Sequence, residues 1–347
     1  MKRLAGLAGI QANILLLLGG SAVALGMGEA LVRAHGWPTP GLYRDGKGPL
    51  ALRVPGEGGG AYPPQGWGRL RHYDYDVAWQ VNSDGFRERE PEPKSRGEWR
   101  VALLGDSFAA GVGVEASGCF AAYWNRTAGP AVTLWNLASP SCGTSCEAAI
   151  LRVAGARYDA DEVVVAFFGG NDLSDNLAWS RAGPATMEVD SDWNGRVWLR
   201  EHSRLATFLW VGFARGFARF RPPGVYDTAE FERLWPFTEE ALASLRSAAG
   251  ARPLSLVYLP SSPEWDDGLW RWARAQYGLR EEGRFLVSSA LARWAGTHGV
   301  RFFDVTPALR RCPTAAECCF PVDPHWNVGG HRLVGEALAS SFPLARP

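Results

Sequence analysis

Five short apolar runs constrain the fold of this chain more than any other feature of its sequence. They cover residues 100–104, 132–137, 162–168, 254–259 and 300–305, are rich in β-branched or aromatic residues, and each ends at a turn. Helical patterns lie between them and after them, including 283–297 and 329–341. Strands that alternate with helices predict a three-layer α/β/α fold around a doubly wound, flavodoxin-like sheet of about five parallel strands. In such a sheet the site lies at the carboxyl ends of the strands.

Charge and composition exclude some classes of function. The 347 residues are 46% hydrophobic, which is enough to bury a substantial core. Lysine plus arginine equals aspartate plus glutamate, 36 of each, so no net field attracts a polyanion. We therefore expect no nucleic-acid partner.

The N-terminus predicts the compartment. A basic start, Met1 to Arg3, precedes a charge-free run from Leu4 to Gly28, and about 25 residues of helix suffice to cross a bilayer. The basic flank stays in the cytoplasm, so we expect residues 1–34 to form a single-pass anchor and the rest of the chain to be extracytoplasmic, which in a bacterial cell would mean the periplasm. The alternative is secretion after cleavage of a signal peptide, because Ala22-Val23-Ala24 has the spacing of a cleavage site.

Beyond the anchor, the sequence divides into an arm and one large domain. Residues 35–98 are rich in glycine and proline, which predicts an irregular extracytoplasmic arm with a short hairpin around 73–82. The domain covers 99–347 and carries a helical insertion at about 174–253. Within the insertion, apolar residues recur at helical spacing, namely Leu205, Phe208, Leu209, Phe213 and Phe217. They form either an extra helix packed on the domain, or a lid or membrane-surface helix.

Six cysteines suit an oxidising compartment, and an even set permits 15 pairings. For Cys142 and Cys146 a disulfide or two buried thiols are better interpretations than zinc, because no suitable ligand pair accompanies them. A bridge from Cys312 to Cys318 or Cys319 would hold the loop that follows. The nearby run from Thr144 to Glu147 has the pattern of a helix capping box.

Three motifs carry the chemistry, and two of them directly follow predicted strands. Ser107 follows the first strand in Gly-Asp-Ser, where a helix N-terminus stabilises negative charge. Asn171 follows the third in Gly-Asn-Asp and can donate its amide to an oxyanion. Asp323 and His325 precede the last helix, as an orienting carboxylate and a general base would. Each motif alone is weak, but together they indicate nucleophilic acyl transfer. His331, further along that helix, is interpreted as structural.

With these motifs the chain resembles the SGNH (GDSL-type) hydrolases over about residues 82–338. It is particularly similar to a bacterial membrane-anchored branch with an Asn-Ser-x-Gly-Phe-Arg stretch, here 82–87. The resemblance implies that Ser107 is the nucleophile, His325 the base and Asp323 its orienter. It also implies an oxyanion hole made by the backbone amides of Ser107 and Ser141 and the side chain of Asn171.

Two departures from the family pattern bear on the site. Ser141 stands where the family has a glycine, which is conformationally freer. One residue, Pro324, separates Asp323 from His325 where the family has two, so the side chains converge only if the backbone turns there. The shorter Asp-x-His-Trp form resembles polysaccharide O-acetyltransferases of the same superfamily.

The sequence therefore predicts a serine ester hydrolase acting on an acylated small molecule or polysaccharide, most simply an acetyl ester in the cell envelope or on an exported chain. One alternative is an O-acetyltransferase of the same superfamily. Another is a non-catalytic carbohydrate-binding or assembly protein that uses tryptophans to stack on sugars. No metal and no cofactor is expected, because no motif for either is present.

Overall fold

The computed structural model describes residues 2–35, 41–44, 48–49, 64–72, 74–182, 203–206, 208–209, 224–321, 323–342 and 344. They belong to two compact units. The first consists of segments of 1–40, 71–73 and 192–221, and the second contains the remainder of the chain.

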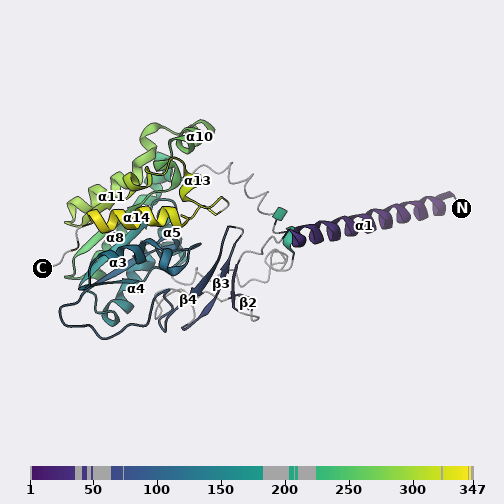
Figure 1. Cartoon of the computed structure of the whole chain (residues 1–347). Coiled ribbons are helices and arrows are strands. Elements are labelled where there is room, and N and C mark those ends of the chain that lie inside the picture. Colours follow the sequence, from purple (N-terminus) through teal and green to yellow (C-terminus); the bar gives the residue numbers. More distant parts are fainter. Residues whose placement is uncertain are drawn as a thin grey trace. The chain divides into compact units, whose positions relative to one another are not determined.

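The second unit is built on a five-stranded parallel sheet (Figure 1). Its strands are β5 (Trp99–Gly105), β6 (Val132–Asn136), β7 (Glu162–Phe168), β8 (Leu254–Leu259) and β9 (Arg301–Asp304), in the order β6-β5-β7-β8-β9. All four neighbouring pairs are parallel. The predicted strands are confirmed, and their ends differ from the prediction by at most one residue.

Alternate residues of the strands face opposite sides of the sheet, and both sides are buried. In β7, Val163, Val165 and Phe167 belong to one buried cluster, whereas Val164 and Ala166 belong to the other. A strand buried on both faces must be apolar throughout, which is why these runs are continuous rather than alternating.

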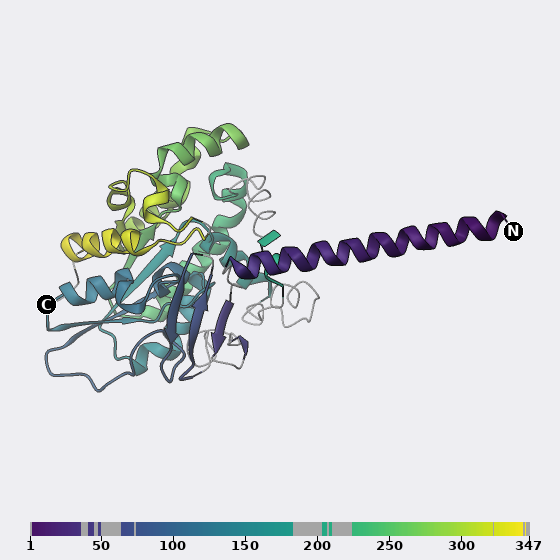
Figure 2. The same cartoon turned by 45° about the vertical axis from the view of Figure 1, so that its right-hand side comes forward.

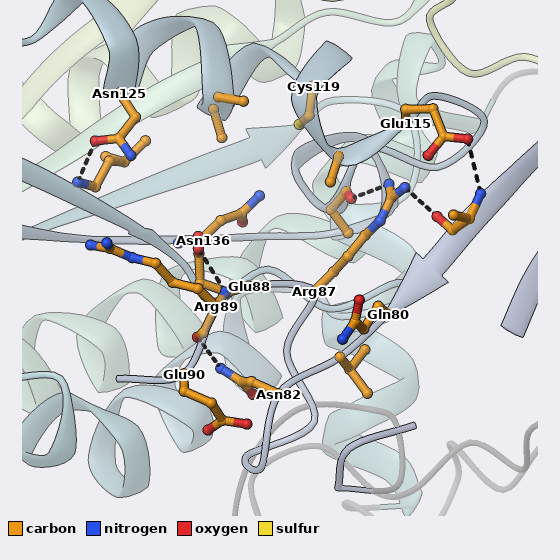
Figure 3. Close-up of a pocket in the computed structure, with 17 residues that line it drawn as sticks. Gln80, Asn82, Arg87, Glu88, Arg89, Glu90, Glu115, Cys119, Asn125 and Asn136 are labelled. Carbon is orange, nitrogen blue, oxygen red and sulfur yellow. Dashed lines mark hydrogen bonds between the residues drawn. The ribbon is translucent and has the colours of Figure 1, made fainter. Parts of the chain in front are cut away.

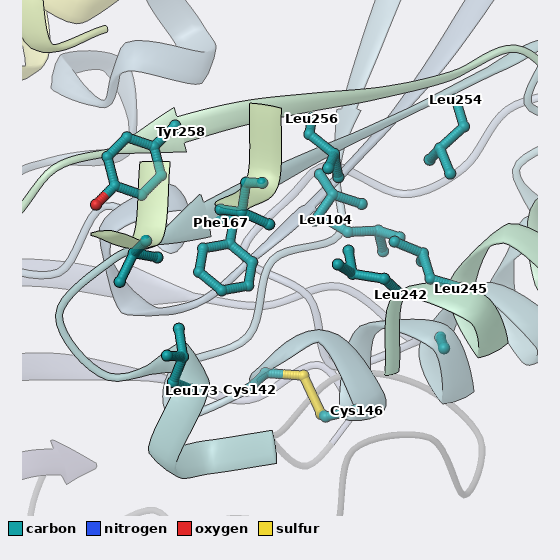
Figure 4. Packing of buried hydrophobic residues seen from close by; sticks show 14 of the residues in the cluster. Leu104, Cys142, Cys146, Phe167, Leu173, Leu242, Leu245, Leu254, Leu256 and Tyr258 are labelled. Carbon is teal, nitrogen blue, oxygen red and sulfur yellow. A yellow bond between two sulfur atoms is a disulfide. The ribbon is translucent and has the colours of Figure 1, made fainter. Parts of the chain in front are cut away.

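Helices cover both faces and complete the three-layer fold. The first cluster includes residues of α4 (Thr144–Arg157), α5 (Asp172–Ala182), α8 (Thr228–Ala249), α10 (Asp267–Tyr277) and α11 (Leu286–Thr297). Figure 4 shows leucines of α8 packed towards strand residues beside the Cys142–Cys146 disulfide. The second cluster includes residues of α2 (Ser107–Ala110), α3 (Phe120–Thr127), α9 (Ser262–Trp265), α12 (Thr306–Leu309), α13 (Ala315–Cys318) and α14 (Val328–Ser341). Short 3-10 turns lie at Ala116–Gly118, Gly224–Tyr226 and Glu281–Phe285.

Four further strands precede this sheet and form a second one. They are β1 (Gly41–Arg44), β2 (Gly48–Pro49), β3 (Trp67–Arg71) and β4 (Asp76–Gln80), in the order β2-β1-β3-β4. The hairpin predicted around 73–82 overlaps β4 alone, because its neighbour β3 lies before that range. Residues of β4 and of the segment after it enter the core, because Trp79 and Phe86 are fully buried and belong to the two core clusters.

The predicted capping box at Thr144 is wrong. The N-cap of α4 is Gly143, so Thr144 lies one residue inside the helix and its hydroxyl cannot cap. Among the described residues, neither that hydroxyl nor either carboxylate oxygen of Glu147 has a hydrogen-bond partner. A side chain from α5 caps the helix instead, since Asn176 Oδ1 accepts a hydrogen bond of 3.0 Å from the backbone amide of Ser145.

The first unit contains the helix α1 (Lys2–Ala34), drawn as one continuous helix in Figure 2. By length and composition, its stretch Asn13–Ala34 could cross a membrane, with a mean hydropathy of 1.8 and none of the stretch buried. Near its end, Glu29 accepts hydrogen bonds from Ser203 and from the backbone amides of Arg204 and Leu205. Other residues of the predicted insertion helix, including Phe213 and Phe217, lie outside the described residues.

Candidate active site

The turn after β5 exposes Ser107 at the start of a helix. Asp106 caps α2 by accepting a hydrogen bond of 2.9 Å from the backbone amide of Phe108. Gly105 is required for this close turn, since a Cβ there would lie 2.6 Å from the Cβ of Ala109 and 3.1 Å from the carbonyl oxygen of Ala166. Ser107 itself is partly exposed, so its hydroxyl can meet a ligand.

The structure brings Ser107, His325 and Asp323 together. His325 Nε2 lies 2.7 Å from Ser107 Oγ, and His325 Nδ1 contacts Asp323 Oδ1. The same carboxylate oxygen accepts a hydrogen bond of 2.9 Å from the backbone amide of His325. The backbone therefore turns at Pro324, and the two side chains converge in spite of the short spacing. This is the order of contacts through which a histidine held in one tautomer can deprotonate a serine.

The environment of Asp323 keeps its carboxylate charged. Burial acts to raise its pKa, but hydrogen bonds from the ring and amide of His325 and from Tyr75, together with the charge of His325, lower the pKa to about 2. A negative carboxylate beside the ring stabilises the imidazolium that forms when His325 accepts a proton.

The loop that presents His325 is held at both ends. The backbone amide of Phe320 donates to His325 O at 3.0 Å, and that of Asn327 donates to Cys318 O at 2.9 Å. Asn327 also caps α14 through Gly329 and Gly330. A disulfide joins Cys312 to Cys318, as one of the two predicted pairings, and Cys319 is a buried free thiol. Hydrogen bonds and a disulfide thus hold the loop that carries the candidate base, His325.

Two contacts to Asp323 were not predicted from the sequence. Tyr75 Oη donates to Asp323 Oδ2 at 2.8 Å, and Asp74 Oδ2 accepts from the backbone amide of Asp323 at 2.7 Å. Both residues lie between β3 and β4, 248 and 249 positions away from Asp323 along the chain. The only sequence signal was the hairpin predicted around 73–82, which includes both residues but does not indicate what they contact.

The two other predicted oxyanion residues follow the strands on either side of β5. Ser141 has φ of 61°, the left-handed conformation usual for glycine, so serine takes the conformation expected of the family residue at a cost of about 1–2 kcal/mol. Asn171 follows β7 directly before α5 and is partly exposed. Because β5 and β7 are parallel and pair up to Gly105 and Ala166, the turns that carry Ser107 and Asn171 lie at the same edge of the sheet.

Four carboxyl groups gather behind the nucleophile turn. Burial raises the pKa of Asp106 to about 6 and that of Asp175 to about 7. Burial, reinforced by the charges of the other carboxyl groups, raises the pKa of Glu147 and Asp172 well above the usual range. None of these residues contacts His325 in the way Asp323 does. Within the described residues, no cluster of three or more potential ligands has the arrangement of a metal site.

Aromatic rings pack against the imidazole of His325. The ring centroids of Phe108 and His325 lie 4.7 Å apart, and Phe168 stacks on Phe108 at 4.0 Å. His331 is fully buried, and its Nδ1 accepts a hydrogen bond of 3.3 Å from the backbone amide of Phe120. Burial lowers the pKa of His331 to about 3, so it stays neutral and acts in packing.

Comparison with known proteins identifies similar chains. The model of the GDSL-like lipase/acylhydrolase family matches residues 103–333, which is more than half of the chain. No curated protein sequence matches.

Three solved structures illustrate the likeness, and each covers 70% of this chain. A carbohydrate acetylesterase from Sinorhizobium meliloti is 14% identical, with 97% of its own chain covered and a TM-score of 0.39. A lipase/acylhydrolase from Enterococcus faecalis is 15% identical, with 93% covered and a TM-score of 0.41. An aryl esterase from M. smegmatis is 14% identical, with 96% covered and a TM-score of 0.41.

Proposed function

The chain belongs to the GDSL-like lipase/acylhydrolase family, and on that premise we propose that it is a serine ester hydrolase that works through an acyl-enzyme. The observation that carries this proposal is the hydrogen-bonded series from Ser107 through His325 to Asp323. A non-catalytic carbohydrate-binding protein would need no such series, so the geometry favours the enzyme.

In the first step, Ser107 Oγ attacks the ester carbonyl carbon while His325 Nε2 accepts the hydroxyl proton. The carbon–oxygen bond of the ester then breaks, and His325 returns the proton to the departing alkoxide, leaving the acyl group on Ser107. Asp323 holds the ring and stabilises its positive charge. In the second step, water attacks the acyl-enzyme with His325 again as base, which releases the carboxylic acid and restores the serine.

The oxyanion of each tetrahedral intermediate would lie between the backbone amides of Ser107 and Ser141 and the side-chain amide of Asn171. Each donor of this kind contributes roughly 3 kcal/mol to lowering the barrier. The N-terminus of α2 adds a favourable field for negative charge.

The substrate that fits best is an O-acyl ester, most simply an acetyl ester, of a cell-envelope or exported polysaccharide. Support comes from the apolar helix α1, which places the domain outside the cytoplasm if it crosses the membrane. The spacing of Asp323, His325 and Trp326 resembles that of polysaccharide O-acetyltransferases. An acetyltransferase is therefore the second candidate, since a sugar hydroxyl can replace water in the second step.

A fluorophosphonate probe tests the enzyme class directly. The serine oxygen forms a bond to phosphorus, fluoride leaves, and the protein gains a covalent label. We expect one label on the full-length protein in detergent, located on Ser107 by peptide mass spectrometry, and none on Ser107→Ala. Absence of label on folded wild-type protein would overturn the proposal.

A second measurement separates the two candidates. The full-length protein is incubated with acetylated polysaccharide, with and without an unacetylated acceptor. A hydrolase releases acetate at the same rate in both cases, whereas a transferase moves acetyl groups to the acceptor, which mass spectrometry detects.

A further inference from the structure

One sequence motif has no role in the mechanism above, namely the stretch 82–87 that ends in Arg87. The Arg87 side chain is almost fully buried, with 8% of its surface exposed. Its guanidinium donates to four backbone carbonyls, those of Ala110 at 3.3 Å and of Gly111, Ala78 and Val114 at 2.8 Å each. Figure 3 shows this group beside a pocket of about 510 Å³, with Arg87 reaching between two segments of chain.

Two of those carbonyls end the helix that begins with Ser107. That helix, α2, has four residues, and its C-cap is Gly111. A helix of this length has no independent stability, because nucleation costs more than its few hydrogen bonds return. The direction of Ser107 therefore depends on what holds the far end of α2. The charge-assisted bonds from Arg87 to Ala110 and Gly111 hold this end. Asn136 and Cys119 add hydrogen bonds to Ala109 O, at 2.8 and 3.3 Å.

Arg87 is itself fixed by its surroundings. Its guanidinium lies 4.1 Å from the ring centroid of Trp79, a cation–π contact with a fully buried side chain. The turn before it is closed by Asn82, whose Oδ1 accepts from the backbone amides of Asp84 at 3.0 Å and Phe86 at 3.1 Å. Only a residue tolerant of φ of 83° fits at Gly85 within this turn.

The start of the same segment contacts the other end of the candidate site. Asp74 and Tyr75 bind Asp323, as described above, and Tyr75 also packs against Phe320 with ring centroids 5.0 Å apart. A single stretch, 74–87, thus contacts the carboxylate that orients the base and the helix that carries the nucleophile. These two groups come from opposite ends of the domain sequence.

We propose that the segment 74–87 sets the distance between nucleophile and base, with Arg87 and Tyr75 as positioning residues. The inference rests on the proposed function, since it assigns a role in the Ser107–His325–Asp323 site. Arg87 acts through α2 and Tyr75 through Asp323, and neither reaches the reacting atoms. Because the carbonyls occupy both terminal nitrogens of Arg87, its charge serves the protein backbone rather than a ligand in the neighbouring pocket.

The variant Arg87→Lys tests the first contact. A lysine ammonium has three donors on one atom and cannot reproduce a planar fork that spans four carbonyls. We expect kcat and the rate of fluorophosphonate labelling at Ser107 to fall roughly 100-fold, the effect of a displacement of about 1 Å in the reacting groups, with KM little changed. Added guanidinium ion should restore part of the labelling rate to Arg87→Ala.

The matched control is Arg100→Lys. Arg100 is also buried, lies 5.5 Å from the ring centroid of Trp135, and binds the backbone carbonyls of Tyr158 and Glu92. Its side-chain hydrogen bonds go to these residues and to Glu98, not to α2. Its replacement should therefore lower stability with kcat and labelling within about twofold of the wild type. Equal losses in the Arg87 and Arg100 variants would overturn the inference.

Tyr75→Phe keeps the ring and removes only the hydroxyl bonded to Asp323, so it tests the second contact without threatening the fold. We expect roughly a tenfold loss of kcat at unchanged KM, and a shift of the NMR signal of the proton on His325 Nδ1. Tyr123→Phe on α3 is the control. An unshifted signal and an unchanged kcat in Tyr75→Phe would show that Tyr75 is not a positioning residue. A wild-type protein that takes no fluorophosphonate label would contradict the proposed function instead. Failure of the proposed function and failure of this inference therefore give different results.

Discussion

The residue between Asp323 and His325 determines how the candidate base is held. In an extended strand, two residues separated by one neighbour lie on the same face but stay apart along the strand. Their side chains therefore do not meet unless the backbone turns. Pro324 fixes its own φ and begins a turn instead. Asp323 can then accept from both the amide and the ring of His325. The short spacing is compatible with a triad for this reason.

Asp323→Asn tests whether that carboxylate is needed. We expect kcat to fall about 10⁴-fold, because an amide can hold the wrong tautomer of His325 and cannot stabilise its positive charge. Steady-state rates of ester hydrolysis measure the effect, beside His325→Ala. A loss near tenfold for Asp323→Asn, with an inactive His325 variant, would mean that the enzyme works as a Ser-His dyad.

Asn171→Ala tests the oxyanion assignment. Because the amide would act mainly on the charge that develops in the transition state, we expect kcat to fall by about 100-fold or more with little change in KM. Full Michaelis curves are needed to separate the two constants. If only KM changes, Asn171 binds the substrate and does not stabilise the oxyanion.

At the scale of elements, helices α2, α4 and α5 bring carboxyl groups together in the interior. Asp106 precedes α2, Glu147 is in the first turn of α4, and Asp172 and Asp175 are in the first turn of α5. A carboxyl group at a helix N-terminus is ordinarily favourable when charged. Here burial outweighs that effect and favours the protonated forms, as the raised pKa values of Asp106 and Asp175 express.

This cluster predicts how stability depends on pH. The folded protein retains protons that the unfolded chain releases. The resulting contribution of the cluster to the free energy of unfolding is therefore fully present below the usual carboxyl pKa of about 4. It is lost as the pH rises through the folded values, which are about 6 for Asp106 and about 7 for Asp175. We therefore expect the melting temperature to fall between about pH 4 and pH 8.

The variant Glu147→Gln tests whether the carboxyl cluster causes this fall of the melting temperature with pH. The change keeps the shape and removes the charge, so the variant should melt a few degrees above the wild type at pH 8 and show a shallower slope. Scanning calorimetry across the pH range measures both quantities. The exposed Glu282→Gln should match the wild type, and a Glu147 variant with an unchanged slope would show that this residue does not titrate with the cluster.

At the scale of the whole molecule, α1 decides whether the protein is anchored to a membrane. Its stretch Asn13–Ala34 is apolar enough to span a membrane, but a signal sequence has the same character. The prediction from the sequence is that α1 is retained as an anchor, although Ala22 to Ala24 have the spacing of a cleavage site.

Expression of the full chain in a bacterial host tests this inference. We expect the protein in the membrane fraction after washing at high pH, with the peptide from Leu4 to Arg33 recovered by mass spectrometry. Leu16→Arg places a charge in the middle of the span and should reduce membrane recovery. Val153→Arg, at an exposed position of α4, should not. A soluble protein whose N-terminus follows Ala24 would establish cleavage.

Local patterns were sufficient to predict much of this protein. The strands could be placed to within a residue, because a strand buried on two faces must be apolar throughout. Ser107 and Asn171 could be selected as candidates because they follow strands of one sheet, and His325 because it lies near a carboxylate just before the last helix. The contacts of the segment 82–98 with the core could not be predicted, because glycine and proline indicate turns without indicating what packs beside them.

The sequence by itself determined the layer order, the apolar helix at the N-terminus and the candidate site residues Ser107, Asn171 and His325. Only the tertiary structure decided that Asp323 reaches His325 and that Cys312 pairs with Cys318. It also decided that Tyr75 contacts Asp323 and that Arg87 contacts the end of α2. The reason is physical. Periodicity and propensity are properties of neighbours in the chain, whereas each of these contacts joins groups whose separation depends on how the backbone turns and packs.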